Sequence, residues 1–247
     1  MHIGRTTQTG GAAAAQITAA ASSSVTSLEL GAGRIPYDRS GRQEISFRHP
    51  ALLAVRTSKG CEFFIRALDI AGSLMILILS LPLMFAVAVA VKLSSSGRVF
   101  YGQRRVGKSG KLFTLYKFRT MIENAEEHVG PVWATPNDSR VTSIGRVLRR
   151  TRLDELPQLF NVVLGDMSLV GPRPERPYFV ERHEALQGIR LAVKPGITGL
   201  AQVRSYYDLK PEHKLKYDYL YIQRRSLLLN AYILLQTIPV LFTKKGW

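Results

Sequence analysis

One stretch of the chain restricts the fold more than any other. Residues Ile70 to Val91 read IAGSLMILILSLPLMFAVAVAV, which is 22 residues without a charge. A helix of this length, at about 1.5 Å per residue, can cross the hydrocarbon core of a bilayer. A helix in the core of a soluble protein is rarely so uniformly apolar. The stretch therefore predicts a helix embedded in a membrane.

Two features of this stretch argue against a simple transmembrane span. Pro82 lies near its middle, where it removes a helical hydrogen bond and favours a kink. Both flanks are also basic, with Arg48, Arg56, Lys59 and Arg66 before the stretch and Lys92, Arg98, Arg104, Arg105, Lys108 and Lys111 after it. Because basic residues tend to stay on the cytoplasmic side, a re-entrant helix that breaks at Pro82 and returns fits better than a single span, which stays as the alternative.

The rest of the chain divides into a leader and a domain. The first 50 or so residues are rich in Ala, Gly, Ser and Thr and lack the apolar core of a secretory signal, so we expect them to be disordered. The 46% hydrophobic content of the whole chain is enough to fill a core. We expect a disordered leader at 1–55, a membrane-embedded re-entrant helix with its approach at 56–95, and a domain at 96–247.

The charge balance restricts the partners. The chain has 34 Lys and Arg against 18 Asp and Glu, a net charge of +16, so its partner is a nucleic acid, an anionic membrane surface or a phosphorylated substrate. We see no helix-turn-helix, finger or RNA-binding signature, which argues against nucleic acid. The single Cys61 excludes an internal disulfide, and the five histidines show no zinc-ligand spacing.

Beyond the apolar stretch, the pattern predicts a mostly helical α+β domain. Two strands are expected at 98–106 and 111–121, with a turn at 107–110. Helices are expected at 123–129, 144–151, 155–164, 176–187 and 213–223, and irregular segments at 131–139 and 195–199. Residues 226–242 are nearly all apolar and fit an interfacial helix and a buried core helix equally well.

The sharpest local signal is the adjacent acid pair Asp154 and Glu155, which follows an arginine-rich turn. A carboxylate nucleophile must be ionised, and we expect a helix N-terminus and the arginines to lower the pKa of Asp154. A second carboxylate can help to hold a divalent cation that bridges phosphates. The alternative is that Asp154 only caps a helix and Glu155 pairs with Arg152.

Two further segments could bind phosphate. The prolines of the GPRP run, Gly171 to Pro174, fix the backbone around Arg173 and could present its guanidinium to phosphate, unless Arg173 pairs with Glu175. Lys117 and Arg119 lie on one side of the second expected strand, which is either a phosphate-facing edge or a solvated face. The KPGITG turn at 194–199 carries no function by itself.

Taken in order, these segments resemble a known family. The motifs are the apolar segment with its central proline, YGQRRVGKSGKLFTLYKFRTM at 101–121, LRRTRLDELPQLFNVVLGDMSLVGPRPE at 148–175 and KPGITGLAQV at 194–203. The series resembles the bacterial sugar transferases, the monotopic polyprenyl-phosphate phosphoglycosyl transferases, from Cys61 to the C-terminus. The larger members carry an N-terminal bundle of membrane helices, so the resemblance implies the small form here.

The resemblance implies an enzyme on the cytoplasmic face of the bacterial inner membrane. It would move a sugar-1-phosphate from a UDP-sugar to undecaprenyl phosphate, release UMP, and initiate exopolysaccharide, capsule or glycoconjugate synthesis. Asp154 would be the nucleophile, with Glu155 as its partner in holding Mg²⁺, and the family positions suited to charge stabilisation are Arg149, Arg173, Lys117 and Arg119. The implied partners are the sugar donor, the lipid acceptor and membrane lipids, without nucleic acid; a homo-oligomer is left open.

Some positions depart from the family pattern. Leu81 precedes Pro82 where the family often has serine, and Ser80 lies one place earlier. Residues 204–207 replace a common Asn-Gly-Arg-Asn, and Asn230 stands where Asp is frequent. These differences leave the identity of the sugar open. The rival interpretation is a membrane-tethered scaffold with a basic surface, but a scaffold would not need the acid pair and both phosphate-type motifs together.

Overall fold

We describe the fold from a computed structural model, which describes residues 58–126, 138–204 and 211–242. The expected disordered leader lies outside these ranges. Most of the 131–139 segment, residues 127–129 of an expected helix, and residues 205–207, which differ from the family pattern, also lie outside them. Glu123 to Glu126, the described part of that helix, forms turns instead.

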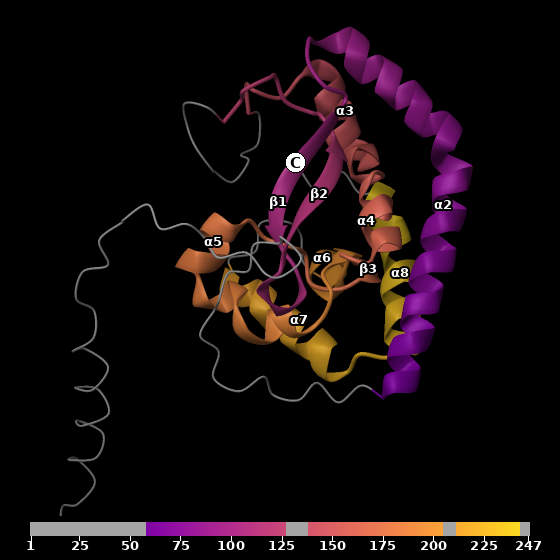
Figure 1. Cartoon of the computed structure of the whole chain (residues 1–247), viewed down its shortest axis with the longest axis vertical. Helices are drawn as coiled ribbons and strands as arrows, with labels where there is room; N and C mark the ends of the chain where they lie inside the picture. Colours follow the sequence, from indigo (N-terminus) through magenta and orange to yellow (C-terminus); the bar gives the residue numbers. More distant parts are fainter. Residues whose placement is uncertain (1–57, 127–137, 205–210, 243–247) are drawn as a thin grey trace, which may run out of the picture. The chain divides into compact units, whose positions relative to one another are not determined.

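The apolar stretch and its basic approach form one helix, α2, from Lys59 to Ser94. Of the helices in the described residues, α2 is the one that is long and apolar enough to cross a membrane. Pro82 lies inside α2, and the helix continues through it as one curved helix (Figure 1), so the predicted break of the helix at Pro82 is wrong. The Ser80 hydroxyl donates to the Leu77 carbonyl at 3.2 Å, next to the Ile78 carbonyl that proline leaves without its helical donor.

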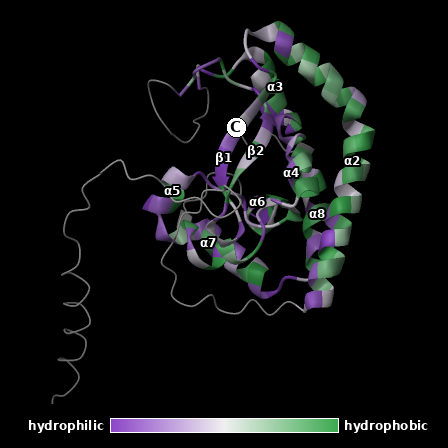
Figure 2. Cartoon of the chain, in the orientation of Figure 1, coloured by the Kyte–Doolittle hydropathy of each residue, from purple (hydrophilic) through white to green (hydrophobic). Residues whose placement is uncertain are grey.

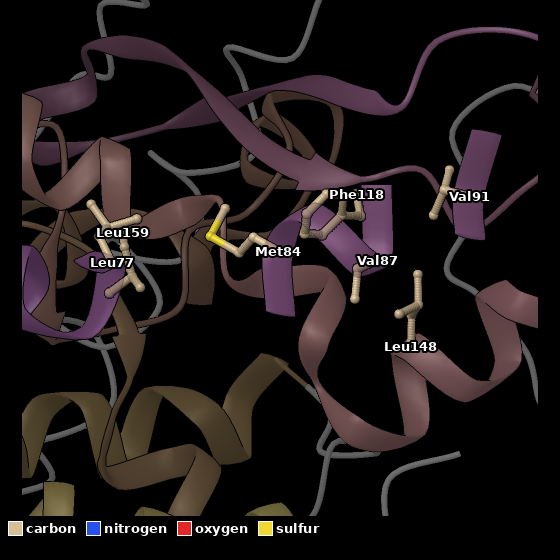
Figure 3. Packing of buried hydrophobic residues seen from close by; sticks show 7 residues of the cluster. All are labelled: Leu77, Met84, Val87, Val91, Phe118, Leu148 and Leu159. Atoms are coloured by element: carbon tan, nitrogen blue, oxygen red, sulfur yellow. The ribbon is translucent and has the colours of Figure 1, made fainter. Parts of the chain in front are cut away.

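Helix α2 buries one side along its length and exposes the other. The buried stripe follows the helical period and consists of Ile65, Asp69, Ser73, Leu77, Met84, Val87 and Val91. Four of these residues, Leu77, Met84, Val87 and Val91, pack against Phe118, Leu148 and Leu159 of the domain (Figure 3). On the other side, Leu79 and Phe85 are 75% and 73% exposed, and the hydrophobic colour covers the middle of the helix (Figure 2). An exposed apolar face therefore runs along α2.

The predicted hairpin is confirmed. Strands β1, Phe100–Val106, and β2, Leu112–Phe118, pair antiparallel, with Phe100 opposite Phe118 and Val106 opposite Leu112. A 3-10 turn, Lys108–Gly110, joins them, and Gly110 adopts a left-handed φ of 79°. The last strand residue, Phe118, turns its ring into the core beneath α2.

Two short helices follow the hairpin. Helix α3, Ser143–Thr151, begins where the Thr142 hydroxyl accepts from the Gly145 amide, close to the predicted start. Helix α4 runs from Gln158 to Leu164 and so begins three residues later than predicted, because Leu153–Glu155 form a separate 3-10 turn.

The sequence did not predict a second, parallel pair of strands. β3, Ser168–Val170, pairs with β4, Gly196–Thr198, inside the expected KPGITG turn. The two backbones approach so closely that a Cβ on Gly196 would lie 2.0 Å from the amide nitrogen of Gly171. This ribbon joins the GPRP run to the KPGITG turn.

Four helices complete the fold. They are α5 (Pro177–Arg182), α6 (Leu200–Arg204), α7 (Pro211–Gln223) and α8 (Leu227–Phe242), with 3-10 turns at Glu184–Leu186 and Gly188–Ala192. Helix α5 packs against the hairpin, and α6, α7 and α8 pack against Val170 of the ribbon. Helix α8 buries Ile233 against Tyr221 and Ile222 of α7 but leaves Leu228 84% exposed. The expectation of a buried core helix at 226–242 is therefore met in part, while the interfacial position stays a prediction. The described fold is the mostly helical α+β class that the sequence predicted.

Polar side chains attach α2 to the domain near both of its ends. Arg66 donates to the carbonyls of Val162 and Val163 at 2.6 and 3.0 Å, at the C-terminus of α4. Asp69 accepts from the Ser168 hydroxyl and the Leu169 amide at 3.0 and 2.9 Å. At the other end, Arg119 donates to carbonyls of Ser95 and Ser96. Helix α2 is thus part of the domain's framework.

Candidate active site

The acid pair lies in the 3-10 turn between α3 and α4. Helix α3 ends at Thr151, and the residue after it, Arg152, is in the left-handed conformation with φ 60°. The Glu155 amide donates to the Arg152 carbonyl at 3.1 Å. This change of direction turns the two carboxyls toward the hairpin, where Asp154 and Glu155 are only 6% and 8% exposed. Left-handed non-glycine residues store backbone strain and cluster at functional sites.

Cations from two distant segments converge on this pair. Arg173 donates to the two carboxylate oxygens of Glu155 at 2.6 and 3.3 Å. Lys117 of β2 approaches Glu155 at 3.2 Å and Asp154 at 3.9 Å. The fold therefore brings together four of the residues predicted for the site. The Glu175 carboxylate, the alternative partner of Arg173, is instead bound by Lys214 at 3.0 Å.

The two carboxyls differ in acidity. Burial opposes ionisation of Glu155, but Arg173 and Lys117 outweigh it and hold the pKa of Glu155 well below its usual range. For Asp154 burial dominates and raises the pKa, although Lys117 opposes the shift. The expectation that a helix N-terminus and arginines lower the pKa of Asp154 is therefore wrong, because Asp154 precedes α4 by four residues and is almost fully desolvated.

The other predicted residues take different places. The Nε of Arg149 donates to the Thr120 hydroxyl at 2.9 Å, and the charge of Asp154 acts on Arg149, which places Arg149 beside the pair. Arg119 is not brought to the pair: its guanidinium, buried at the C-terminus of α2, binds the Ser95 carbonyl and hydroxyl at 2.8 and 2.9 Å. Pro82 lies within α2.

The donor set of the pair fits a magnesium ion only in company with a substrate. The described residues contain no group of three or more His, Cys, Asp and Glu side chains that could hold a metal. Two adjacent carboxylates nevertheless suit Mg²⁺, which keeps several waters and binds through one or two carboxylates plus substrate phosphates. Asp154 and Glu155 meet that requirement.

Sequence reasoning missed a residue that aligns the two halves of the site. Asn161 of α4 is fully buried, accepts from the Tyr116 amide at 3.0 Å and donates to the Thr114 carbonyl at 2.7 Å. These bonds attach α4 to β2 and so hold Lys117 opposite the acid pair. The available signal was an amide within the helical period of an apolar face, where an unpartnered polar group would be costly.

Comparison with known proteins gives a consistent picture. A family model described as bacterial sugar transferase matches residues 61–244. A UDP-N-acetylgalactosamine-undecaprenyl-phosphate N-acetylgalactosaminephosphotransferase of Aeromonas hydrophila is 41% identical over 213 residues, which are 83% of this chain and 50% of that protein. The exopolysaccharide production protein ExoY of Rhizobium meliloti is 37% identical over 195 residues, 73% of this chain and 86% of that protein.

The lengths covered differ among these relatives. The undecaprenyl-phosphate galactose phosphotransferase of Salmonella typhimurium is 40% identical over 208 residues, 78% of this chain and 43% of that protein. The chain thus spans about half the length of several curated relatives that it matches. The match begins at Cys61, in the first turn of α2, and includes the acid pair, Lys117 and Arg173.

Proposed function

The chain belongs to the bacterial sugar transferase family, and on that premise we propose that it transfers a sugar-1-phosphate from a UDP-sugar to undecaprenyl phosphate. The observation that carries the proposal is the buried acid pair, in which Glu155 is bound by Arg173 and Lys117 while Asp154 is left beside one of these cations. Relatives are named as phosphotransferases for this lipid acceptor, with different sugars.

In the first step, a carboxylate oxygen of Asp154 attacks the phosphorus that carries the sugar. A bond forms from Asp154 to that phosphorus, the bond from the phosphorus to the bridging oxygen breaks, and UMP leaves with the electron pair. Arg173, Lys117 and Arg149 stabilise the charge on the phosphate oxygens. Glu155 keeps Arg173 and Lys117 in place, since its ionised carboxylate contacts both.

In the second step, a phosphate oxygen of undecaprenyl phosphate attacks the same phosphorus. The bond to Asp154 breaks, the carboxylate returns, and the product is an undecaprenyl diphosphate sugar. A covalent intermediate lets a soluble donor and a lipid acceptor use one site in turn. Asp154 and Glu155 would hold Mg²⁺, which would supply positive charge that stabilises the donor phosphates.

We propose further that α2 is re-entrant, so that the domain stays on the cytoplasmic face of the inner membrane. The buried stripe from Ile65 to Val91 supports this, because a helix that packs on the domain along its length cannot cross the bilayer without drawing that domain into it. The exposed apolar face of α2 and the basic residues at both of its ends are compatible with a position in one leaflet.

Release of UMP tests the chemistry. The purified protein, incubated with undecaprenyl phosphate, Mg²⁺ and a panel of UDP-sugars, should release UMP with at least one sugar. Asp154→Asn should abolish release, whereas the matched change Asp166→Asn, at the other end of α4, should not. With the acceptor omitted, a radiolabelled sugar phosphate should stay on the denatured wild-type protein. Absence of this label alongside rapid UMP release would show direct transfer, without an intermediate on Asp154.

Cysteine labelling tests the topology. In a Cys61→Ser background, Lys59→Cys and Arg98→Cys place single thiols at the two ends of α2. Both should resist a membrane-impermeant maleimide in intact cells and react once the inner membrane is permeabilised. Reaction of either thiol in intact cells would establish a single span and exclude re-entry.

A further inference from the structure

Each backbone carbonyl from Pro172 of the GPRP run to Glu175, the residue after the run, accepts a hydrogen bond from another segment. The Pro172 carbonyl accepts from the Gly196 amide at 2.9 Å, and the Glu175 carbonyl accepts from the Val106 amide at 3.0 Å. Two arginine side chains donate to the two carbonyls that lie between these. Arg105 donates to the Pro174 carbonyl at 3.0 Å, and Arg190 donates to the Arg173 carbonyl at 3.1 Å.

The bond from Arg190 is supported by an ion pair in the interior. The Nε of Arg190 donates to a carboxylate oxygen of Asp218 at 2.6 Å, and the two side chains are only 4% and 2% exposed. Asp218 belongs to α7, far in sequence from the acid pair. Arginine can serve both partners at once because its guanidinium carries donors pointing in different directions, whereas a lysine has one small ammonium group.

An ion pair this deeply buried needs a reason. Taking two charges out of water is costly, and replacing such a pair by apolar residues often leaves stability unchanged or improves it. Stability alone therefore accounts poorly for Arg190 and Asp218. Within the described residues, they reach the reaction centre through the hydrogen bond from Arg190 to the carbonyl of Arg173, whose guanidinium binds Glu155.

We propose that Arg190 and Asp218 are positioning residues for the transfer reaction, which fix the backbone of Arg173 and thereby aim its guanidinium at Glu155 and the donor phosphate. This inference rests on the proposed function for its kinetic consequences. Two prolines leave the GPRP run few amide donors of its own, so the orientation of Arg173 is set by outside donors. A displacement of about 1 Å at a reacting centre costs roughly 100-fold in rate.

Conservative variants separate positioning from simple stabilisation. Arg190→Lys keeps a cation for Asp218 but cannot also reach the Arg173 carbonyl, so it should lower UMP release about 10- to 100-fold. Asp218→Asn keeps an acceptor for Arg190 and should give a smaller loss in the same direction. Ile222→Ala, one turn further along α7 and equally buried, is the control for a weakened α7 and should leave the rate of folded enzyme within about threefold. Full activity of Arg190→Lys would overturn the proposal.

A double-mutant cycle tests whether the effect passes through Arg173. In an Arg173→Lys background, adding Arg190→Lys should cost far less than it does in the wild type, because the group that it aims is already gone. Equal losses in the two backgrounds would mean that Arg190 acts elsewhere, and the proposal would be wrong.

Hydrogen exchange gives a readout that does not depend on activity. Amides within residues 171–176 should exchange about tenfold faster in Arg190→Lys and Asp218→Asn than in the wild type, but not in Ile222→Ala. Unchanged exchange in this segment would overturn the positioning role even for variants that lose activity. If the wild type releases no UMP from any UDP-sugar, the proposed function fails, and the exchange comparison still decides whether Arg190 and Asp218 hold this run.

Discussion

Replacing Arg119 tests whether this arginine stabilises the fold, as its contacts indicate, or binds phosphate, as the family pattern implies. The family pattern places Arg119 among the phosphate-binding positions, whereas the fold buries its guanidinium at the C-terminus of α2. There it binds the carbonyl and hydroxyl of Ser95 and the carbonyl of Ser96. A cation at this end of a helix also stabilises the helix dipole.

The cost of Arg119→Lys follows from these contacts. Lysine keeps the charge and at most one of these three bonds, so at least two charge-assisted hydrogen bonds are lost, each worth about 1.5–3 kcal/mol. We expect a total loss of about 3–6 kcal/mol, a large part of the stability of an ordinary domain. For a chain of this size the unfolding midpoint should fall by roughly 6–24 °C.

The assay compares stability with turnover in the same detergent-solubilised preparation. Thermal unfolding followed by circular dichroism should show the lower midpoint, while UMP release well below that midpoint should stay close to the wild-type rate. Gly97→Ala should act similarly, because its Cβ would lie 2.2 Å from a guanidinium nitrogen of Arg119. Arg98→Lys, an exposed neighbour, is the control. An unchanged midpoint together with a loss of turnover like that of Arg173→Lys would refute the framework role.

Other predictions concern the surroundings of the site. Burial alone would raise the pKa of Glu175, but Lys214, Arg190 and Arg105 outweigh burial and lower that pKa below its usual value. Glu175→Gln should therefore lower the free energy of unfolding at neutral pH, and urea titrations should show this difference shrinking as the pH falls through the lowered pKa. A difference that stays constant with pH would contradict the assignment. Gly196→Ala should lower both the unfolding midpoint and UMP release, because its Cβ collides with Gly171, while Gly60→Ala, with no atom nearer than 4.0 Å, should do neither. Lys117→Met should reduce UMP release by about 100-fold or more, because it removes the cation shared by the acid pair, and a loss smaller than about threefold would exclude a catalytic role.

The sequence predicted those features that depend on local pattern. Alternation along 98–121 identified the hairpin, and the helical period identified α3. The ordered motifs identified the acid pair, Lys117 and Arg173, which the fold does bring together.

Features that depend on long-range packing escaped prediction. Strands β3 and β4 have three residues each and pair across 25 intervening residues, too short and too distant to leave a periodic signal. Arg119 and Arg173 look equivalent in sequence, and only the position where α2 ends assigns one of them to the framework. The raised pKa of Asp154 reflects burial by segments that the local sequence does not reveal.

The packing of α2 against the domain fixes the position of the acid pair relative to this apolar helix. A helix that only tethered the domain would leave the acid pair free to vary in depth, since a flexible linker allows a wide range of positions. Here Arg66 binds the C-terminus of α4, and Arg119 joins the end of β2 to the end of α2. The acid pair lies just before α4, and Lys117 lies two residues before Arg119, so both halves of the site are attached to the same helix. With the apolar face of α2 in a leaflet, the depth of Asp154 would then be fixed by protein packing, as the proposed transfer from Asp154 to a lipid phosphate requires.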